Sequence, residues 1–265
     1  MKKIFVLLCA AAMMTVACEK EEPTPAQETP ANPSDTTQVD PPTEVFIHNA
    51  VTDYDGNSYD AVRIGSQVWM ASNLRTTHYA NGEAIPDGGE NTSETAPYRY
   101  QSTGTTDLSS YGYLYNWPAV MHGASSSSSN PSGVQGVCPN GWHVPSDVEW
   151  LQLTDYCSGH TECVCSGDGN NIAKSLAADH DWQITTVECA VGNDLSSNNI
   201  TGFSALPAGS YYGSYTGFGT NALFWGATSG SSSGAHGFYL DYRYAYVGRN
   251  IPYKYVGFSV RCVRD

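Results

Sequence analysis

Six cysteines in the second half of the chain constrain its fold more than any other feature of the sequence. They are Cys138, Cys157, Cys163, Cys165, Cys189 and Cys262. An even number of cysteines in an exported protein is typical of disulfides, and the sequence alone leaves their pairing open. We expect the four central cysteines to form a local pair of bridges. The alternative is a zinc site on these four, but C-x-C spacing does not match a usual zinc knuckle and no His pair lies nearby.

Export is predicted by the start of the chain, where residues 1–17 have the form of a signal peptide. Two lysines precede an apolar core over residues 4–16, which is too short to cross a bilayer. Cys18 then closes a segment that resembles a bacterial lipobox, in which the cysteine is acylated after cleavage. The lipobox usually has a larger aliphatic residue in place of Thr15. We expect a lipid anchor at Cys18, and an ordinary secretory signal is the alternative.

Residues 18–43 predict a disordered tether. The acidic run over residues 19–22 resembles the signal that sends Bacteroidetes lipoproteins to the outer face of the outer membrane, although it also suits the charged start of a linker. Residues 23–42 contain almost no large apolar side chain, so they cannot bury enough surface to offset the entropy lost on ordering. We therefore expect an outer-membrane lipoprotein that faces the cell exterior and carries one folded domain over residues 44–265.

The composition narrows the class of partner. The chain has 26 Asp and Glu against 12 Lys and Arg, and no basic patch is evident. This balance argues against nucleic acid or anionic lipid as a partner. Tyr is the most frequent aromatic residue, and Tyr, Ser, Gly and Asn in abundance are typical of binding surfaces. Exported β-rich domains often have this composition whatever they bind.

Hydrophobic patterning predicts an α+β fold with antiparallel sheets, two short helices and long loops. Apolar runs separated by Asp-Gly and Gly-Ser turns predict a β-meander over residues 45–74. Ser146 and Glu149 form a capping-box pattern at the start of a helix that we expect to end before Ser158. A second short helix is expected over residues 171–178. Strands are expected over residues 203–209, 222–228, 238–247 and 255–263.

Four segments together are specific enough to suggest a family. They are Cys138-Pro-x-Gly-Trp-His-Val-Pro-Ser-Asp-x-Glu-Trp150, Gly202-Phe-Ser-Ala-Leu-Pro-Ala-Gly209, Phe224-Trp-x-Ala-Thr228 and Gly257-Phe-Ser-Val-Arg-Cys-Val-Arg-Asp265. Over residues 51–265 the chain resembles the Fibrobacter succinogenes major paralogous domain, which recurs in exported proteins. The resemblance implies a bridge between Cys138 and Cys262, and the other four cysteines are extra to the usual pattern. The motif order also resembles the C-type-lectin-like fold, including its formylglycine-generating-enzyme branch, an analogy that does not imply function.

We expect a binding module, an adhesin or a receptor for a glycan or protein ligand, rather than an enzyme. The candidate ligand-binding residues are Tyr211, Tyr212, Tyr215, Trp225, Tyr239, Tyr242, Arg243 and Tyr244. Aromatic faces suit stacking on sugars, and Arg can bind hydroxyl groups. The equal alternative is that Trp225 and half of these tyrosines belong to the core. Calcium has no support from the sequence, because the carboxylate-amide triplet of calcium-dependent lectins is absent. No cofactor is expected, and a metal site stays open.

Two other functions are weaker alternatives. An oxidase of the formylglycine-generating type requires two free cysteines near the last strand, where only Cys262 lies. No Gly-x-Ser-x-Gly elbow is present, and His143 suits a structural role at the start of a helix better than that of a base. A structural or accessory role at the tip of a surface appendage would suit a lipid-anchored stalk as well as a receptor does.

Overall fold

Antiparallel sheets and short helices make up the part of the chain that the computed structural model describes, residues 46–101 and 107–265. The α+β class expected from the sequence is therefore confirmed. The expected signal peptide, Cys18 and the tether lie outside the described residues. Within the described ranges, none of the helices has the length and apolar character needed to cross a bilayer.

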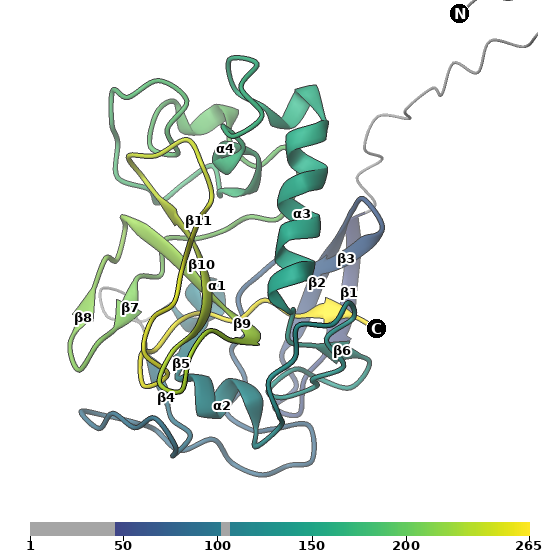
Figure 1. Ribbon diagram of the computed structural model, residues 1–265, viewed down its shortest axis with the longest axis vertical. Helices are drawn as coiled ribbons and strands as arrows, with labels where there is room; N and C mark the ends of the chain where they lie inside the picture. The colour runs from purple at the N-terminus through teal and green to yellow at the C-terminus, as the bar shows by residue number, and fades with distance from the viewer. Residues whose placement is uncertain (1–45, 102–106) are drawn as a thin grey trace, which may run out of the picture. The chain divides into compact units, whose positions relative to one another are not determined.

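The largest sheet has five strands in the order β1-β2-β3-β12-β6 and joins the two ends of the domain (Figure 1). Strands β1 (Phe46–Thr52), β2 (Ser58–Ile64) and β3 (Gln67–Met70) form the predicted antiparallel meander. Strand β12 (Val263–Arg264) pairs with both β3 and β6 (Trp142–His143). The last residues of the chain therefore lie between its first hairpin and its middle.

A second sheet has three antiparallel strands in the order β11-β10-β9. They are β9 (Asn221–Ser229), β10 (Ala235–Asp241) and β11 (Gly248–Asn250). Two further pairs complete the strands: β4 (Arg99–Gln101) with β5 (Tyr113–Tyr115), and β7 (Ser210–Tyr211) with β8 (Tyr215–Thr216).

Helix α3 (Asp147–Gly159) lies between the two main sheets (Figure 1). Its Trp150 ring lies 4.7 Å from Trp69 of β3 and 4.9 Å from Phe238 of β10, measured between ring centroids. The predicted capping box is present, because the Ser146 side chain accepts from the backbone N–H of Glu149 while the Glu149 carboxylate accepts from the N–H of Ser146. The helix continues through Gly159, slightly beyond the expected end.

The other helices are short. They are α1 (Leu108–Tyr111), α2 (Trp117–Met121), α4 (Ala173–Leu176) and the 3-10 turns η1 (Thr161–Cys163) and η2 (Leu195–Ser197). Only α4 was predicted, and it occupies the middle of the expected range. Helix α2 begins where the Asn116 side chain accepts from the N–H of Ala119 at 3.2 Å.

The strands expected in the last third of the chain are only partly present. Residues 203–209 form no strand beyond a bridge at Ala205, whose N–H donates to the carbonyl of Leu176. Strand β10 stops at Asp241 because its carboxylate accepts from the N–H of Arg243 at 2.9 Å and turns the chain. Residues 255–263 form bridges and the start of β12 rather than one long strand.

Arg261 ties three separate segments together from inside the core. Its guanidinium is fully buried and donates to the Asn73 side chain at 2.8 Å and to the carbonyl of Ser204 at 2.7 Å. It also donates to the carbonyls of Met70 and Phe203, and it packs over the Phe203 ring. Burial lowers the pKa of this guanidinium to about 9. Arg261 therefore connects β3, residues 203–204 and the end of the chain.

Two disulfides are present among the described residues. The structure joins Cys138 to Cys262, the pair that the resemblance implies, with Cα atoms 6.0 Å apart. It also joins Cys165 to Cys189, while Cys157 and Cys163 are buried thiols. One bridge, instead of the expected two, thus lies within the central group of four cysteines.

Candidate ligand-binding surface

Two of the residues predicted to bind a ligand are buried, with exposed fractions of 2% for Tyr211 and 0% for Trp225. The Trp225 indole N–H donates to the carbonyl of Tyr115 at 2.8 Å, and its ring packs against Phe258. Tyr211 stacks on Tyr100 with ring centroids 4.1 Å apart. Both side chains therefore belong to the core, the alternative left open by the sequence, because successive residues of β9 are covered on both faces and the β7 ring is enclosed by its neighbours.

Tyr212 and Tyr215 belong to the short β7–β8 hairpin. Tyr212 is exposed, while the half-buried Tyr215 packs edge-on against Tyr211 at 4.8 Å. Tyr212 lies 6.3 Å from the Phe258 ring, and burial and the nearby Tyr255 raise the pKa of its hydroxyl. These contacts place the hairpin tyrosines with the core residues beneath them.

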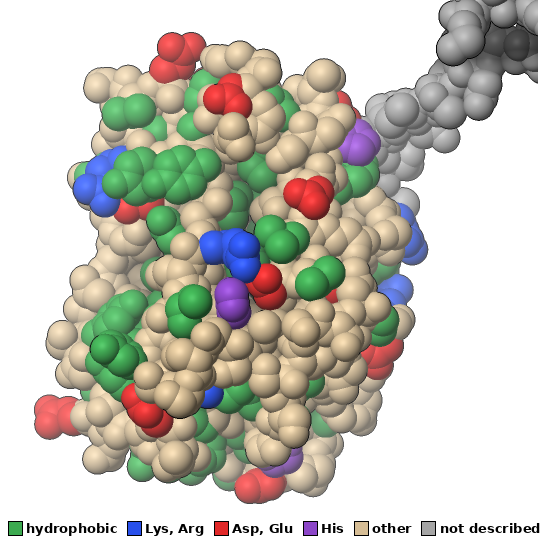
Figure 2. Space-filling view, in the orientation of Figure 1, with side chains coloured by type: hydrophobic (Ala, Val, Ile, Leu, Met, Phe, Trp, Pro, Cys, Tyr) green, Lys and Arg blue, Asp and Glu red, His purple; other side chains and the backbone are tan. Residues whose placement is uncertain are grey.

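The remaining predicted residues form one group, exposed at Arg243 and Tyr244 and half-buried at Tyr239 and Tyr242, which we name the tyrosine–arginine surface. It consists of Tyr239, Tyr242, Arg243 and Tyr244, together with Tyr246, which the sequence analysis did not single out. The rings of Tyr244 and Tyr246 stack with centroids 5.0 Å apart and planes 15° apart. Their exposed fractions are 37% and 42%. Figure 2 shows hydrophobic and basic side chains gathered over this turn between β10 and β11.

Arg243 holds the tyrosines of this surface in place. Its guanidinium carbon lies 5.5 Å from the centre of the Tyr242 ring and 5.3 Å from that of Tyr244. Asp241 accepts from its Nε at 2.9 Å and from its Nη2 at 2.8 Å. Burial raises the pKa of the Asp241 carboxyl, but the hydrogen bonds from Arg243 outweigh burial and lower it. The arginine is therefore neutralised by a partner on its own turn.

A hollow of about 200 Å³ adjoins the tyrosine–arginine surface. Its wall combines the Tyr246 ring with polar side chains from three parts of the chain. They are Thr154, Asp155 and Ser158 from α3, Asn170 from the following loop, and Arg249 from β11. Residues with hydroxyl, carboxylate, amide and guanidinium side chains therefore line the same small volume as Tyr246, together with the apolar Leu151, Ile172, Phe238 and Val247.

Arg249, at the edge of this hollow, is also paired with a carboxylate. Its Nη2 lies 2.6 Å and 2.7 Å from the two carboxylate oxygens of Asp147. The Nδ1 atom of His236 lies 3.2 Å from the same carboxylate. Both arginines of this region are thus balanced by aspartates, so the surface offers hydrogen-bonding groups without a strong excess of positive charge.

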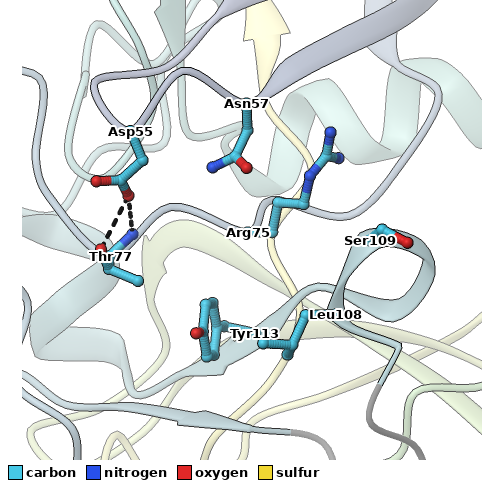
Figure 3. Close-up of a pocket in the computed structure, with 7 residues that line it drawn as sticks. All are labelled: Asp55, Asn57, Arg75, Thr77, Leu108, Ser109 and Tyr113. Atoms are coloured by element: carbon cyan, nitrogen blue, oxygen red, sulfur yellow. Dashed lines mark hydrogen bonds between the residues drawn. The ribbon is translucent and has the colours of Figure 1, made fainter.

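A larger hollow of about 370 Å³ lies between the β1–β2 turn, residues 75–77 and α1 (Figure 3). Asp55 accepts from the N–H of Thr77 at 2.5 Å and from its hydroxyl at 3.0 Å, and it contacts Nδ1 of His78. Arg75 donates to the carbonyl of Ser58 at 2.7 Å. The charged groups of this hollow therefore hold its own loops together. The sequence analysis missed it because Asp55 was explained as a turn residue.

The pKa of the Asp55 carboxyl reflects these contacts. Burial raises it, but hydrogen bonds from Thr77, His78 and Thr76 outweigh burial and lower it. Asp55 is thus an ionised loop-holding residue. Nowhere in residues 46–101 and 107–265 do three or more His, Cys, Asp or Glu side chains gather in a way that could hold a metal ion.

His143 lies in the core, where the sequence analysis expected a structural residue. Its Nε2 lies 2.6 Å from the Glu149 carboxylate, and its Nδ1 lies 2.8 Å from Asp265. Cys262, on which an oxidase of the formylglycine-generating type would depend, is bonded to Cys138. His143, Glu149 and Cys262 thus lie in the interior, away from the exposed tyrosines.

Comparison with known proteins gives one match. The family model described as the Fibrobacter succinogenes major domain matches residues 62–264. No curated protein and no solved structure matches the chain.

Proposed function

The chain belongs to the Fibrobacter succinogenes major domain family, and from this premise we propose that it is a binding module whose tyrosine–arginine surface holds a glycan. The proposal includes the finer fold assignment, a C-type-lectin-like arrangement of the α+β elements. It also includes the role expected from the sequence, that of an adhesin or receptor rather than an enzyme.

The observation that carries the proposal is the exposed, stacked pair of Tyr244 and Tyr246 beside a polar hollow. A tyrosine ring presents a rigid apolar face that can pack on the C–H face of a sugar at low entropy cost. The hydroxyl, amide and carboxylate groups of Thr154, Asn170 and Asp155 supply acceptors and donors for sugar hydroxyls. Few convergent polar groups beside an aromatic face are typical of small-ligand sites.

The charge of the surface favours an uncharged glycan over an acidic one. Arg243 is engaged by Asp241, and Arg249 by Asp147, so neither guanidinium is free of a carboxylate partner. An anionic sugar would have to compete with these aspartates for the same donors. A neutral sugar requires no such exchange.

The proposal places this module at the cell surface. Acylation of Cys18 would anchor the chain in the outer membrane, and the Pro- and Thr-rich residues 23–42 would hold the domain away from the bilayer. A receptor displayed in this way would meet ligands outside the cell. This arrangement suits an adhesin as well as a glycan receptor.

The test is binding of the full chain to a panel of glycans, with calcium and again with a chelator. The double variant Tyr244→Ala/Tyr246→Ala should weaken binding by about tenfold or more, since the loss of two stacking rings corresponds to at least roughly 1.4 kcal/mol. A matched control is Tyr253→Ala, because Tyr253 and Tyr255 form another stacked pair with centroids 5.5 Å apart and Tyr253 is 55% exposed. This variant should bind like the unaltered chain.

Any of three results would refute the proposal. Binding that survives in the double variant, or that is lost in the Tyr253→Ala control instead, would place the ligand elsewhere. Absence of binding to every glycan in the panel would exclude a sugar ligand and favour a protein partner or a part in appendage assembly. Loss of binding in the chelator alone would assign a role to calcium.

A further inference from the structure

Two buried thiols lie next to each other at the end of α3. The N–H of His160 donates to the carbonyl of Cys157 at 3.2 Å, and the N–H of Cys163 donates to the carbonyl of His160 at 2.9 Å. These two successive turns fold the chain back, so that η1 returns toward the last turns of α3. Cys157 and Cys163 are 0% and 4% exposed and belong to the same hydrophobic cluster.

The two thiols are not equivalent. The hydrogen bond between their sulfurs raises the pKa of Cys157 and lowers the pKa of Cys163. The nearby Ser175 hydroxyl lowers the pKa of both thiols, so the difference comes from the contact between the two sulfurs. Because the thiolate is the nucleophile in thiol–disulfide exchange, Cys163 is the more reactive of the two.

Access from the surface points to the same residue. A hollow of about 190 Å³ is lined by Cys163, Ser175 and the Lys174 side chain, whereas Cys157 does not line it. The hollow is also lined by Cys165, which already forms a disulfide with Cys189. A disulfide reagent that enters this hollow therefore reaches Cys163 before Cys157.

We propose that Cys157 and Cys163 are a redox-active pair that closes a third disulfide by exchange with an external disulfide. The Cys163 thiolate attacks one sulfur of the reagent, which forms a mixed disulfide and releases the first thiol. Cys157 then loses its proton and attacks the Cys163 sulfur, which releases the second thiol. The external disulfide is reduced to two thiols, and the two cysteines are oxidised.

This bridge would brace one wall of the proposed glycan site without belonging to it. Ser158, which lines the hollow beside Tyr246, follows Cys157 directly on α3, and Cys163 lies on the turn that comes next. Linking the two sulfurs would tie the end of α3 to η1. The inference rests on the cysteines alone and stands whether or not a glycan binds.

The test uses the full chain, purified in reduced glutathione and then exposed to rising ratios of oxidised glutathione. After an acid quench, free thiols are alkylated and the unreduced peptides are mapped by mass spectrometry. We expect a peptide linked through Cys157 and Cys163 to appear as the ratio rises. The Cys138–Cys262 and Cys165–Cys189 peptides should stay unchanged over the same range and serve as internal controls.

Two single variants test the order of attack. Cys157→Ser should trap glutathione on Cys163 as a stable mixed disulfide, whereas Cys163→Ser should leave Cys157 unmodified, with adduct formation at least tenfold slower. The peptide map of the unaltered chain decides whether the third disulfide forms, and this result does not depend on whether either variant folds. The proposal is overturned if both thiols persist in oxidised glutathione, if Cys163 is found linked to Cys165 or Cys189, or if both variants gain the adduct equally fast.

Discussion

Replacing His143 by Gln tests whether the motif residues of this family act as scaffold. The imidazole is 2% exposed and bridges Glu149 of α3 and Asp265 at the end of the chain, at 2.6 Å and 2.8 Å. Burial lowers the pKa of His143, but the hydrogen bonds to Glu149 and Asp265 outweigh burial and raise it. A charged imidazolium between two carboxylates therefore joins β6, α3 and the last residues of the domain.

The size of the expected loss in stability depends on the hydrogen bonds that Glu149 keeps in the variant. Its carboxylate is also 2% exposed, and it still accepts from the backbone N–H groups of Ser146 and Ser132 at 2.9 Å and 3.0 Å. Removing one partner of a buried ion pair costs about 3–5 kcal/mol. Because two hydrogen bonds survive, we expect His143→Gln to lower the free energy of unfolding by about 3 kcal/mol, at the lower end of that range. For a domain of this size, that loss lowers Tm by roughly 6–12 °C.

The loss should depend on pH in a defined direction. Folding raises the pKa of His143. The contribution of this histidine to the stability of the folded state is therefore complete below the ordinary pKa of histidine, about 6.5. It is lost as the pH rises through the higher pKa of the folded state. The difference between the unaltered chain and His143→Gln should therefore be larger near about pH 6 than near about pH 9.

Urea unfolding of the full chain, followed by tryptophan fluorescence with the disulfides intact, measures this difference at both pH values. His48→Gln is the matched control, because the His48 side chain is 78% exposed although it lies 3.5 Å from Asp60. An exposed pair of this kind contributes about 0–1 kcal/mol. The reasoning is refuted if His143→Gln differs from the unaltered chain by less than about 1 kcal/mol near pH 6, or if its effect is the same at both pH values.

Two further predictions concern the same core. Arg261→Met should lower the free energy of unfolding by roughly 3–5 kcal/mol, because the Asn73 side chain, two buried carbonyls and the part-buried carbonyl of Ser204 lose their donor. Urea unfolding that shows little change would contradict this. Replacing Cys138 and Cys262 together by Ser removes a disulfide with a sequence separation of 124. Because the unfolded chain gains loop entropy, we expect the free energy of unfolding to fall by about 5 kcal/mol. An unchanged melting temperature would show that the bridge does not stabilise the domain.

The parts of the fold that the sequence predicts well depend on local signals. The turn at Asp55 and Gly56 separates two short alternating segments, and these became β1 and β2. The Ser146–Glu149 box marks the start of α3 to the residue. In each case the signal lies in residues within four positions of one another in the sequence. The turn or the start of the helix can therefore be predicted without knowledge of a distant contact.

The parts that failed depend on distant partners or on competing local bonds. Residues 203–209 have the apolar pattern of a strand, yet the backbone groups of Phe203 and Ala205 bond to Arg261 and to α4 instead of forming a strand ladder. The alternation over residues 238–247 continues past the point where Asp241 turns the chain. Periodicity records which side chains are apolar, but it does not record where a carboxylate captures a backbone N–H.

The candidate surface was predictable only as a composition. An excess of tyrosine indicated that a binding face could exist. The sequence did not show which aromatic residues would lie on it, because Trp225 is buried and Tyr244 is exposed although both are equally good candidates by residue type. The hollow could not be predicted, because Asp155, Asn170 and Arg249 are separated in the chain and meet only when α3 and β11 pack together.

The two sets of residues also differ in their relation to the family. His143, Glu149, Trp225 and Arg261 belong to the motifs that carry the resemblance, and all are buried. The tyrosine–arginine surface and the side chains that line its hollow fall outside those motifs, in residues 151–201 and 229–256. The four extra cysteines also fall in the first of these segments. Because a buried residue constrains packing and an exposed one does not, the same scaffold can carry different sites. Family membership thus identifies the scaffold, while the ligand must be read from the segments between the motifs.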